Sequence, residues 1–155
     1  MKINEVVTNI KERPIKVVQF GEGNFLRAFA DYMIDVANEK GVFDGSVAIV
    51  KCIKFGDLNR FKKQNNLYTA VLRGKHEGEV VNSSRVITSV SAAIDCYEEF
   101  DGYMALARLD SLRFVISNTT EAGIVLNEND TMDGIPETYP AKLTKFLYER
   151  FKVFE

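Results

Sequence analysis

The sequence contains one glycine-rich turn of a type that can bind a phosphate group. The segment GEGN, residues 21–24, follows a short apolar run over residues 15–20 and precedes a helical pattern. In such a unit Gly21 would permit the tight turn, and Gly23 would let the backbone approach a pyrophosphate that rests on the amide groups of the helix. Leu26 stands where a third fingerprint glycine is usual, so the assignment of a dinucleotide site also depends on a strand before the turn and a helix after it.

Basic side chains near this turn leave two cofactor forms open. Arg27 belongs to the first helical turn, where it could bind a phosphate or lie on a solvated face. An NAD site usually has an acidic side chain at the end of the second strand, on the ribose 2′-hydroxyl, but the next acid here is Asp57. Lys51 and Lys54 stand there instead, and they could accept the 2′-phosphate of NADP or be solvated. These residues alone do not choose between NAD and NADP.

A second candidate site is the polar segment SNTTEAG, residues 117–123, at the end of a later apolar run. Open α/β sheets bind ligands at the carboxyl ends of their parallel strands. Asn118, Thr119 and Thr120 offer hydrogen-bond donors and acceptors without charge, and Glu121 adds a carboxylate. Capping of the following segment is the alternative role for these four residues.

Other kinds of catalytic or metal site have little support in the sequence. Cys52 and Cys96 lie far apart, without a CxxC or Cys/His spacing, and predict two buried reduced thiols instead of a disulfide or a zinc site. His76 is the only histidine and falls in a polar, turn-like stretch, which argues against Ser-His-Asp or Cys-His hydrolase chemistry. The acidic residues form no metal-ligand pattern.

The composition indicates a globular protein with a small ligand. The chain has 155 residues, of which 46% are hydrophobic and 27% charged, and its net charge is -2. This length suits one domain with a core of its own. The charge balance lacks the excess of basic residues that binding to nucleic acid or to an anionic membrane requires. No apolar run approaches the roughly 20 residues of a membrane span, and the N-terminal segment lacks the apolar region of a secretory signal. We therefore expect a cytoplasmic protein.

The elements around the glycine turn form one βαβ unit. Residues 15–20 predict a buried strand, and the helix after the turn is expected to begin with Asn24 as N-cap and to end at Gly41. Polar residues recur along this helix at the spacing of a single exposed stripe: Asn24, Arg27, Asp31, Asp35 and Asn38. A second buried strand is predicted over residues 46–53.

The middle of the chain predicts a hairpin, a helix and a further strand. Two β-prone stretches, residues 67–72 and 80–90, flank a glycine-containing polar turn and predict the hairpin. Asp95 looks like the N-cap of a helix over residues 96–108. The apolar segment over residues 113–117 is the third candidate for a parallel core strand.

Pro140 opens a last predicted helix, because proline is favoured in a first helical turn. Its expected apolar face comprises Leu143, Phe146, Leu147 and Phe151. The alternation of strands and helices predicts one α/β domain over residues 1–155, a Rossmann-type three-layer domain with a parallel sheet and the β-hairpin inserted. The three core strands should be adjacent and parallel.

Three segments, QFGEGNFLRAF, SNTTEAG and YPAKLTKFLYERF, closely resemble the N-terminal part of the mannitol dehydrogenase family of long-chain polyol dehydrogenases. The resemblance covers nearly the whole chain. It implies a dinucleotide-binding domain followed by a mainly helical C-terminal domain, with metal-independent interconversion of D-tagaturonate and D-altronate by NADH and NAD. The family's catalytic lysine, with its neighbouring Asn and His, belongs to that C-terminal domain, so we expect no catalytic residue in this chain.

The same resemblance assigns the residues that would touch the cofactor. The phosphate-binding turn would comprise Gly21, Gly23, Asn24, Phe25 and Arg27. The loop beside the nicotinamide end of NAD would comprise Asn118, Thr119, Thr120 and Glu121. The expected partners are a sugar-acid substrate and the absent C-terminal domain, with neither nucleic acid nor a membrane.

Other functions fit parts of this pattern. The cofactor domain of another polyol or mannonate-type dehydrogenase would share its motifs. Methyltransferases that bind S-adenosylmethionine also begin with strand, GxG and helix, although that class favours an acid at the position of Gln19. A non-catalytic nucleotide-binding or interaction domain is the remaining alternative, and as an interaction domain it would present an exposed apolar patch to a partner chain.

Overall fold

The computed structural model describes residues 2–155 and has a four-stranded parallel sheet at its centre. The strand order is β5-β2-β1-β6, with β1 (Ile15–Phe20), β2 (Ser46–Lys51), β5 (Val90–Asp95) and β6 (Phe114–Ser117). All neighbouring pairs in this sheet are parallel, which confirms the predicted arrangement of the three core strands. β5 was not expected as a separate strand, because the β-prone pattern of the hairpin runs into it without a glycine or proline.

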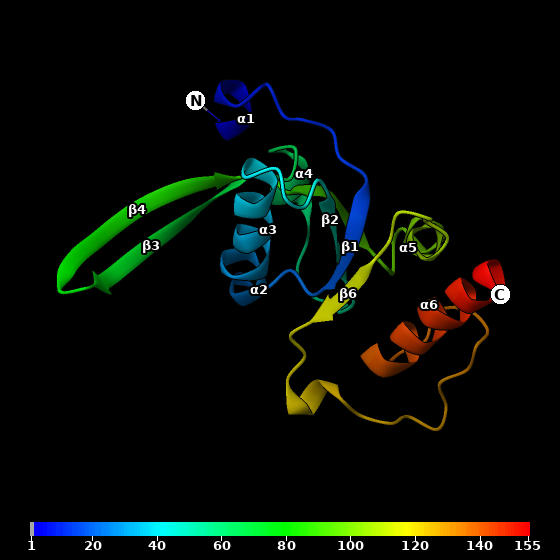
Figure 1. Ribbon diagram of the computed structural model, residues 1–155. Helices are drawn as coiled ribbons and strands as arrows, with labels where there is room; N and C mark the ends of the chain where they lie inside the picture. Colours follow the sequence, from blue (N-terminus) through cyan, green and yellow to red (C-terminus); the bar gives the residue numbers. More distant parts are fainter. Residues whose placement is uncertain (1) are drawn as a thin grey trace.

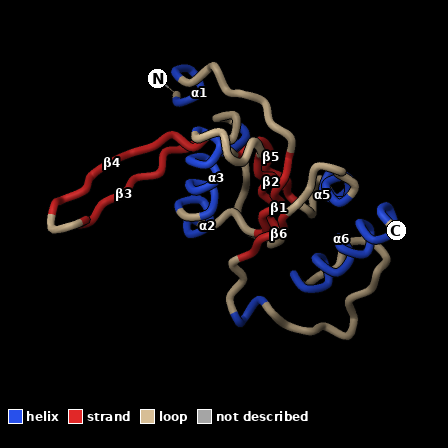
Figure 2. Tube along the Cα trace, viewed as in Figure 1, coloured by secondary structure: helices blue, strands red, loops and turns tan. Residues whose placement is uncertain are grey.

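Helices cover both faces of the sheet, as Figures 1 and 2 show, and this confirms the three-layer prediction. α2 (Asn24–Ala28) and α3 (Ala30–Glu39) lie on one side, while α5 (Phe100–Ala107) and α6 (Tyr139–Phe154) lie on the other. The short elements are α1 (Ile3–Val6), α4 (Asn59–Lys62) and the 3-10 turn η1 (Glu121–Gly123). Among residues 2–155, no helix combines the length and apolar character needed to cross a membrane.

Alternate side chains of the strands supply the two cores. Val18, Phe20 and Val50 pack with Tyr103 of α5 and Phe146 of α6 in the larger cluster. On the opposite face, a smaller cluster of strand residues packs against side chains from α3, α4 and β3: Val17, Val47, Ile49 and Val90. This alternation follows from the two-residue period of a strand, and it fixes the sheet between its helices.

The helix after the glycine turn differs from its prediction in two ways. Its N-cap is Gly23 instead of Asn24, and the helix is interrupted at Phe29 between α2 and α3. The polar stripe is also buried instead of exposed over most of its length, at Asp31, Asp35 and Asn38. The apolar side chains that reach solvent from these two helices include Phe25, Phe29 and Met33.

The inserted hairpin explains this reversal. β3 (Tyr68–His76) and β4 (Glu79–Ile87) pair antiparallel around a turn in which Glu77 and Gly78 both have positive φ, 51° and 86°. Figure 1 shows the hairpin projecting from the domain, with its base beside α3. At this base Arg85 donates to Asp35 and Tyr68 donates to Asp31, so the polar face of the helix finds its partners there. The predicted hairpin is thus confirmed, with strands longer than expected on the turn side.

Two further boundaries depart from the sequence patterns. The helix expected over residues 96–108 begins only at Phe100, because the Asp95 carboxylate binds Lys51 and the Tyr97 amide instead of capping a helix. α6 begins with Thr138 as N-cap, which accepts a hydrogen bond from the Ala141 amide, and has Pro140 in its first turn as predicted. Of its predicted apolar face, Phe146 is buried and Leu143 packs on the core, while Leu147 and Phe151 are exposed.

Candidate functional site

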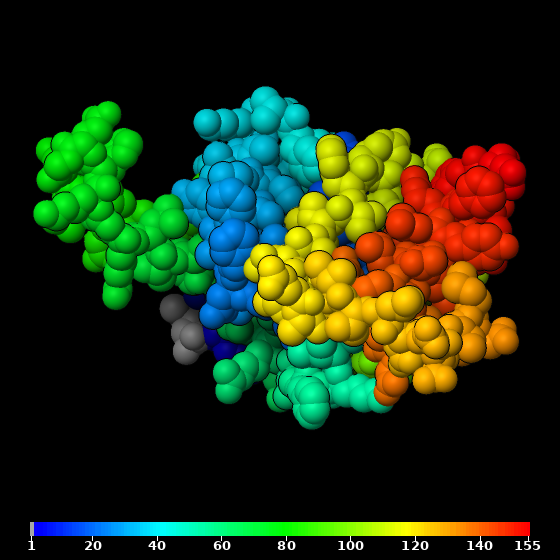
Figure 3. All heavy atoms as spheres, turned by 90° about the horizontal axis from the view of Figure 1, so that it is seen from below, coloured from blue at the N-terminus to red at the C-terminus, as the bar shows by residue number. Residues whose placement is uncertain are grey.

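The candidate site is a cleft at the carboxyl edge of the parallel sheet. From β1 the chain crosses to β2 and then to β5, and it returns to the other side of β1 to form β6. The order therefore reverses between β1 and β6, which is the topological switch point where open α/β sheets bind ligands. Figure 3 looks onto this edge, where the segment after β6 (yellow) lies between α2 (blue) and the segment leading into α6 (orange).

Both predicted motifs reach this cleft. It has a volume of about 350 Å³ and is lined by Phe20, Gly21, Glu22, Gly23, Cys52, Ile53, Asn118, Thr119, Thr120, Gly123 and Tyr139. The residues after β1 and the residues after β6 thus form two of its walls. The two segments are nearly 100 residues apart in the sequence, and the predicted parallel pairing of β1 with β6 brings them together here.

The backbone of the turn explains its two glycines. Gly21 has φ +106°, a conformation that side-chain-bearing residues rarely adopt, and its amide donates to the Val50 carbonyl at 2.9 Å. A Cβ placed on Gly21 or on Gly23 would meet no atom within 4 Å. The space over the turn is therefore open, as a site for a phosphate group requires.

A buried amide supports the turn from behind, and a buried carboxyl group lies beside this amide. Gln19 is fully buried, and its side-chain amide donates to the Gly21 carbonyl at 3.1 Å. Asp31 is also fully buried; burial raises its pKa to about 6, against the opposing effect of the Tyr68 hydroxyl, which lies 2.9 Å from the carboxylate. One oxygen of each side chain, Gln19 Oε1 and Asp31 Oδ1, has no hydrogen-bond partner. The turn thus rests on a polar cluster that is costly to ionise.

Four predicted cofactor residues do not line the cleft. The Arg27 guanidinium lies 5.0 Å from the ring centre of Phe61 and 5.3 Å from that of Tyr68, where cation–π attraction holds it at the base of the hairpin. Arg27 also donates to the Asn24 side chain. Phe25 is exposed and stacks on Phe29 instead. Glu121 begins η1 and lies outside the lining as well.

The two lysines at the end of β2 both form ion pairs within the chain. Lys51 is buried, and its ammonium lies 2.6 Å from the Asp95 carboxylate and 2.7 Å from the Ile53 carbonyl. Lys54 is exposed and pairs with Glu137 at 3.2 Å. Both ammonium groups therefore have carboxylate partners within the chain.

The cleft continues into an apolar hollow that the sequence did not reveal. This part has a volume of about 380 Å³, and its lining includes Ile53, Phe55, Tyr97, Val125 and Tyr139. These side chains come from three loops and from the first residue of α6, and only the general rule that loops at strand ends line ligand clefts could have pointed to the loop residues. A flat apolar ligand group would fit between such walls.

Lys142 fixes one wall of this hollow. It is fully buried, and its ammonium donates to the Tyr97 hydroxyl at 2.8 Å and to the Glu137 carbonyl at 2.6 Å. It also lies 4.6 Å from the centre of the Tyr97 ring. The segment after β5 is thereby tied to the segment before α6.

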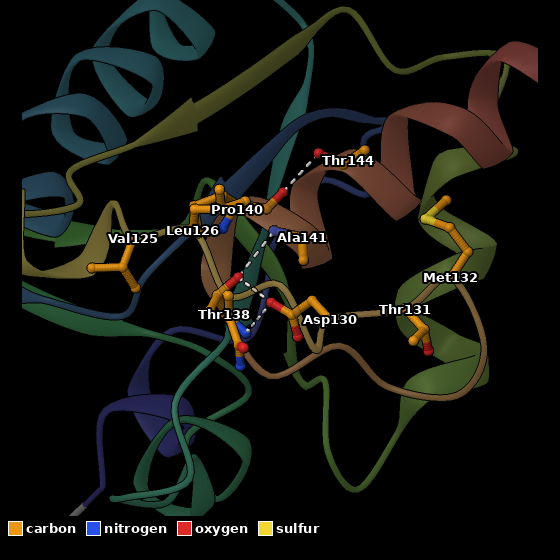
Figure 4. A pocket seen from close by; sticks show the side chains of 10 residues that line it. Val125, Leu126, Asp130, Thr131, Met132, Thr138, Pro140, Ala141 and Thr144 are labelled. Atoms are coloured by element: carbon orange, nitrogen blue, oxygen red, sulfur yellow. Dashed lines mark hydrogen bonds between the residues drawn. The ribbon is translucent and has the colours of Figure 1, made fainter.

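A separate hollow of about 240 Å³ lies between the segment after η1 and the start of α6, as Figure 4 shows. Its one carboxylate, Asp130, accepts hydrogen bonds from the Thr138 hydroxyl and from the amides of Glu137 and Thr138. The carboxylate thus holds the loop together, and we assign the hollow no ligand. Over residues 2–155, no group of three or more His, Cys, Asp or Glu side chains is arranged to hold a metal ion.

The sequence is similar to known sugar-acid oxidoreductases. The altronate oxidoreductase of Bacillus subtilis (strain 168) is 45% identical over 156 residues, which cover 99% of this chain and 32% of that protein. The altronate oxidoreductase of Yersinia pestis is 48% identical over 147 residues, which cover 94% of this chain and 30% of that protein. The chain thus spans about a third of the length of these curated relatives.

The fold is similar to solved polyol dehydrogenases. Mannitol 2-dehydrogenase of Pseudomonas fluorescens, in a ternary complex with NAD and D-mannitol, superposes with a TM-score of 0.72 at 20% identity, over 91% of this chain and 32% of that one. D-sorbitol dehydrogenase in substrate-free form gives a TM-score of 0.73 at 18% identity, over 93% of this chain and 33% of that one. A family model for the mannitol dehydrogenase Rossmann domain matches residues 15–155. The chain therefore belongs to the mannitol dehydrogenase family and contains its Rossmann domain.

Proposed function

We propose that the cleft at the switch point binds NAD. The observation that carries the proposal is the meeting of the open glycine turn and the loop after β6 on two sides of one cleft. The pyrophosphate would lie over Gly21 and Gly23, where an added Cβ meets no atom. The solved mannitol 2-dehydrogenase complex, which contains NAD and shares this fold, supports the same choice of ligand.

The two ends of NAD would lie on opposite sides of the turn. β2 and β5 lie on one side of β1, and the apolar hollow beside them offers Ile53 and Tyr97 to the adenine ring. β6 lies on the other side, where Asn118 and Thr119 would border the nicotinamide. When bound, NAD supplies the hydride acceptor, and the residues of this chain hold and orient it.

The charges at the end of β2 favour NAD over NADP. Recognition of the 2′-phosphate of NADP needs a free cationic side chain near the adenosine ribose. Lys51 is buried in its ion pair with Asp95, and Lys54 is paired with Glu137. An incoming phosphate would have to displace a carboxylate, so we expect weaker binding of NADP.

We further propose that the whole protein interconverts D-tagaturonate and D-altronate. Relatives named altronate oxidoreductase, 45% to 48% identical to this chain, support this assignment. The groups that bind the sugar acid and transfer the proton would lie in the part of the relatives that this chain does not cover. We therefore expect the 155-residue chain to bind NADH without reducing tagaturonate.

Titration with NADH, followed by nicotinamide fluorescence, tests the binding proposal. Gly23→Val would place a side chain where the pyrophosphate is expected. Gly23 has an extended backbone with φ -65°, which valine can adopt, so the variant should fold. We expect at least tenfold weaker binding, or about 1.4 kcal/mol. Gly74→Val in the hairpin is the matched control, because its Cβ also meets no atom within 4 Å and Gly74 is remote from the cleft lining. Equal affinities of Gly23→Val and wild type would contradict the proposal.

A further inference from the structure

The two cysteines, far apart in sequence, are neighbours in the sheet. β2 and β5 are parallel with Lys51 opposite Asp95, and the Cys96 amide donates to the Lys51 carbonyl at 3.1 Å. Cys52 and Cys96 directly follow the last residues of β2 and β5, so they stand side by side at the carboxyl edge. Adjacent strands lie about 4.7–4.9 Å apart. This spacing falls within the roughly 4.4–6.8 Å between Cα atoms that a disulfide requires.

Both thiols point to the same face of the sheet. Cys96 belongs to the larger core cluster, and Cys52 packs against that cluster. No other cysteine occurs in the chain. The pairing of the two strands and the shared side-chain direction therefore both favour a bond between the two sulfur atoms.

The two thiols differ in access. Cys52 is half-buried and lines both the cleft and its apolar continuation, whereas Cys96 is fully buried behind it. A small reagent that enters the cleft therefore reaches Cys52 first. Cys96 is then placed to react only with whatever forms on Cys52.

The surroundings favour loss of a proton from the pair. A hydrogen bond from the Cys52 thiol lowers the pKa of Cys96 against the effect of burial, and the nearby ammonium groups of Lys142 and Lys51 act in the same direction as this hydrogen bond. The same hydrogen bond, together with burial, raises the pKa of Cys52, so the pair loses one proton and keeps the other on Cys52. A thiolate is the form that attacks disulfides.

We propose that Cys52 and Cys96 form a redox modification site in the wall of the cleft, where a low-molecular-weight disulfide converts the two thiols into one disulfide bond. The Cys96 thiolate accepts the proton of the Cys52 thiol while the Cys52 sulfur attacks one sulfur of the reagent, whose S–S bond breaks and releases one thiolate; this thiolate takes up the proton from Cys96. The Cys96 thiolate then attacks the Cys52 sulfur and releases the second thiol. The protein loses two electrons and two protons, and the reagent gains them.

Treatment of the folded chain with oxidised glutathione tests this site. We expect the intact mass to fall by two hydrogen atoms, proteolysis to yield a peptide pair that joins Cys52 to Cys96, and dithiothreitol to restore both thiols. Cys96→Ser should accumulate glutathione on Cys52, whereas Cys52→Ser should stay unmodified while folded. Three results on the wild-type chain would overturn the proposal. These are a glutathione adduct on Cys52 that persists, a disulfide between two chains, or no oxidation of the folded chain under conditions that oxidise the unfolded chain.

A second arm rests on the proposed function, because it assumes that NAD occupies the cleft. With NADH at about ten times its dissociation constant, we expect the modification of Cys52 to slow roughly tenfold, since only the free protein reacts. NADH binding without protection would overturn the placement of Cys52 beside the cofactor. Absence of NADH binding would instead contradict the proposed function, while the oxidation results would stand on their own.

Discussion

Replacing Asp31 with asparagine is predicted to stabilise the domain above pH 6. Asp31 is fully buried, and burial raises the pKa of its carboxyl group from 3.8 to about 6. The folded-state pKa is above the unfolded value, so the neutral acid is favoured in the folded protein. The contribution of Asp31 to stability is therefore complete below pH 3.8 and is lost as the pH rises towards 6.

The size of the effect follows from the two pKa values. Each pH unit between 3.8 and about 6 corresponds to about 1.4 kcal/mol, so ionised Asp31 costs the folded state about 3 kcal/mol at pH 8. An asparagine of nearly the same shape removes this charge. Its amide can also donate a hydrogen bond, and Gln19 Oε1 is a buried acceptor without a partner in the same cluster. We expect Asp31→Asn to add up to about 3 kcal/mol at pH 8 and almost nothing at pH 4.

Asp35, one helical turn away, provides a matched control of opposite sign. Its carboxylate lies 2.6 Å from the Arg85 guanidinium and accepts hydrogen bonds from the Thr88 amide and hydroxyl, both at 2.8 Å. Asp35→Asn should therefore lose roughly 1.5–3 kcal/mol at pH 8, because it weakens charge-assisted hydrogen bonds.

Urea unfolding, followed by circular dichroism between pH 4 and pH 8, measures both variants. The stability difference between Asp31→Asn and wild type should grow with pH up to about 6 and then stay level. A loss of stability in Asp31→Asn at pH 8 would refute this reasoning. A difference that does not change with pH would refute it as well.

Two further variants test the charges beside the cleft. Asp95→Asn leaves Lys51 buried without a carboxylate, so the free energy of unfolding, measured by thermal denaturation, should fall by about 3–5 kcal/mol. Removing the charge of Glu137 from its exposed pair with Lys54 should lower it by about 1 kcal/mol or less. An equally small loss from both pairs would show that burial of the first does not matter. Glu137→Gln frees Lys54, so competition between NADH and NADPH should shift several-fold towards NADPH; an unchanged ratio would place the 2′-phosphate elsewhere.

The parallel core of the fold could be predicted from local patterns. The strand before Gly21 is rich in β-branched residues, and Gly21 itself has the positive φ that only glycine adopts readily. Periodicity also showed which residues of α2 and α3 share a face. It could not show which face is buried, because the partners of Asp31 and Asp35 are Tyr68 and Arg85 in the hairpin, 37 and 50 residues away.

The candidate site was predictable only where a motif carries it. Gly21 and Gly23 follow from their place between a strand and a helix, and Asn118 to Thr120 follow from their place after β6. The apolar hollow, by contrast, also takes Ile53, Phe55 and Tyr97 from loops that carry no motif. The contact between Cys52 and Cys96 likewise depends on β5 pairing with β2, and that strand was hidden in the pattern of the hairpin.

The most direct test of the proposed cleft is an amide NMR titration of the isotope-labelled chain with NADH. We predict the largest shifts at residues 21–23, at residues 52–55 and at residues 118–120, with residues 71–84 of the hairpin unchanged. These segments come together only at the carboxyl edge of the sheet. Saturable shifts confined to the hairpin or to the hollow beside α6, or no shifts at millimolar NADH, would contradict an NAD site at the switch point.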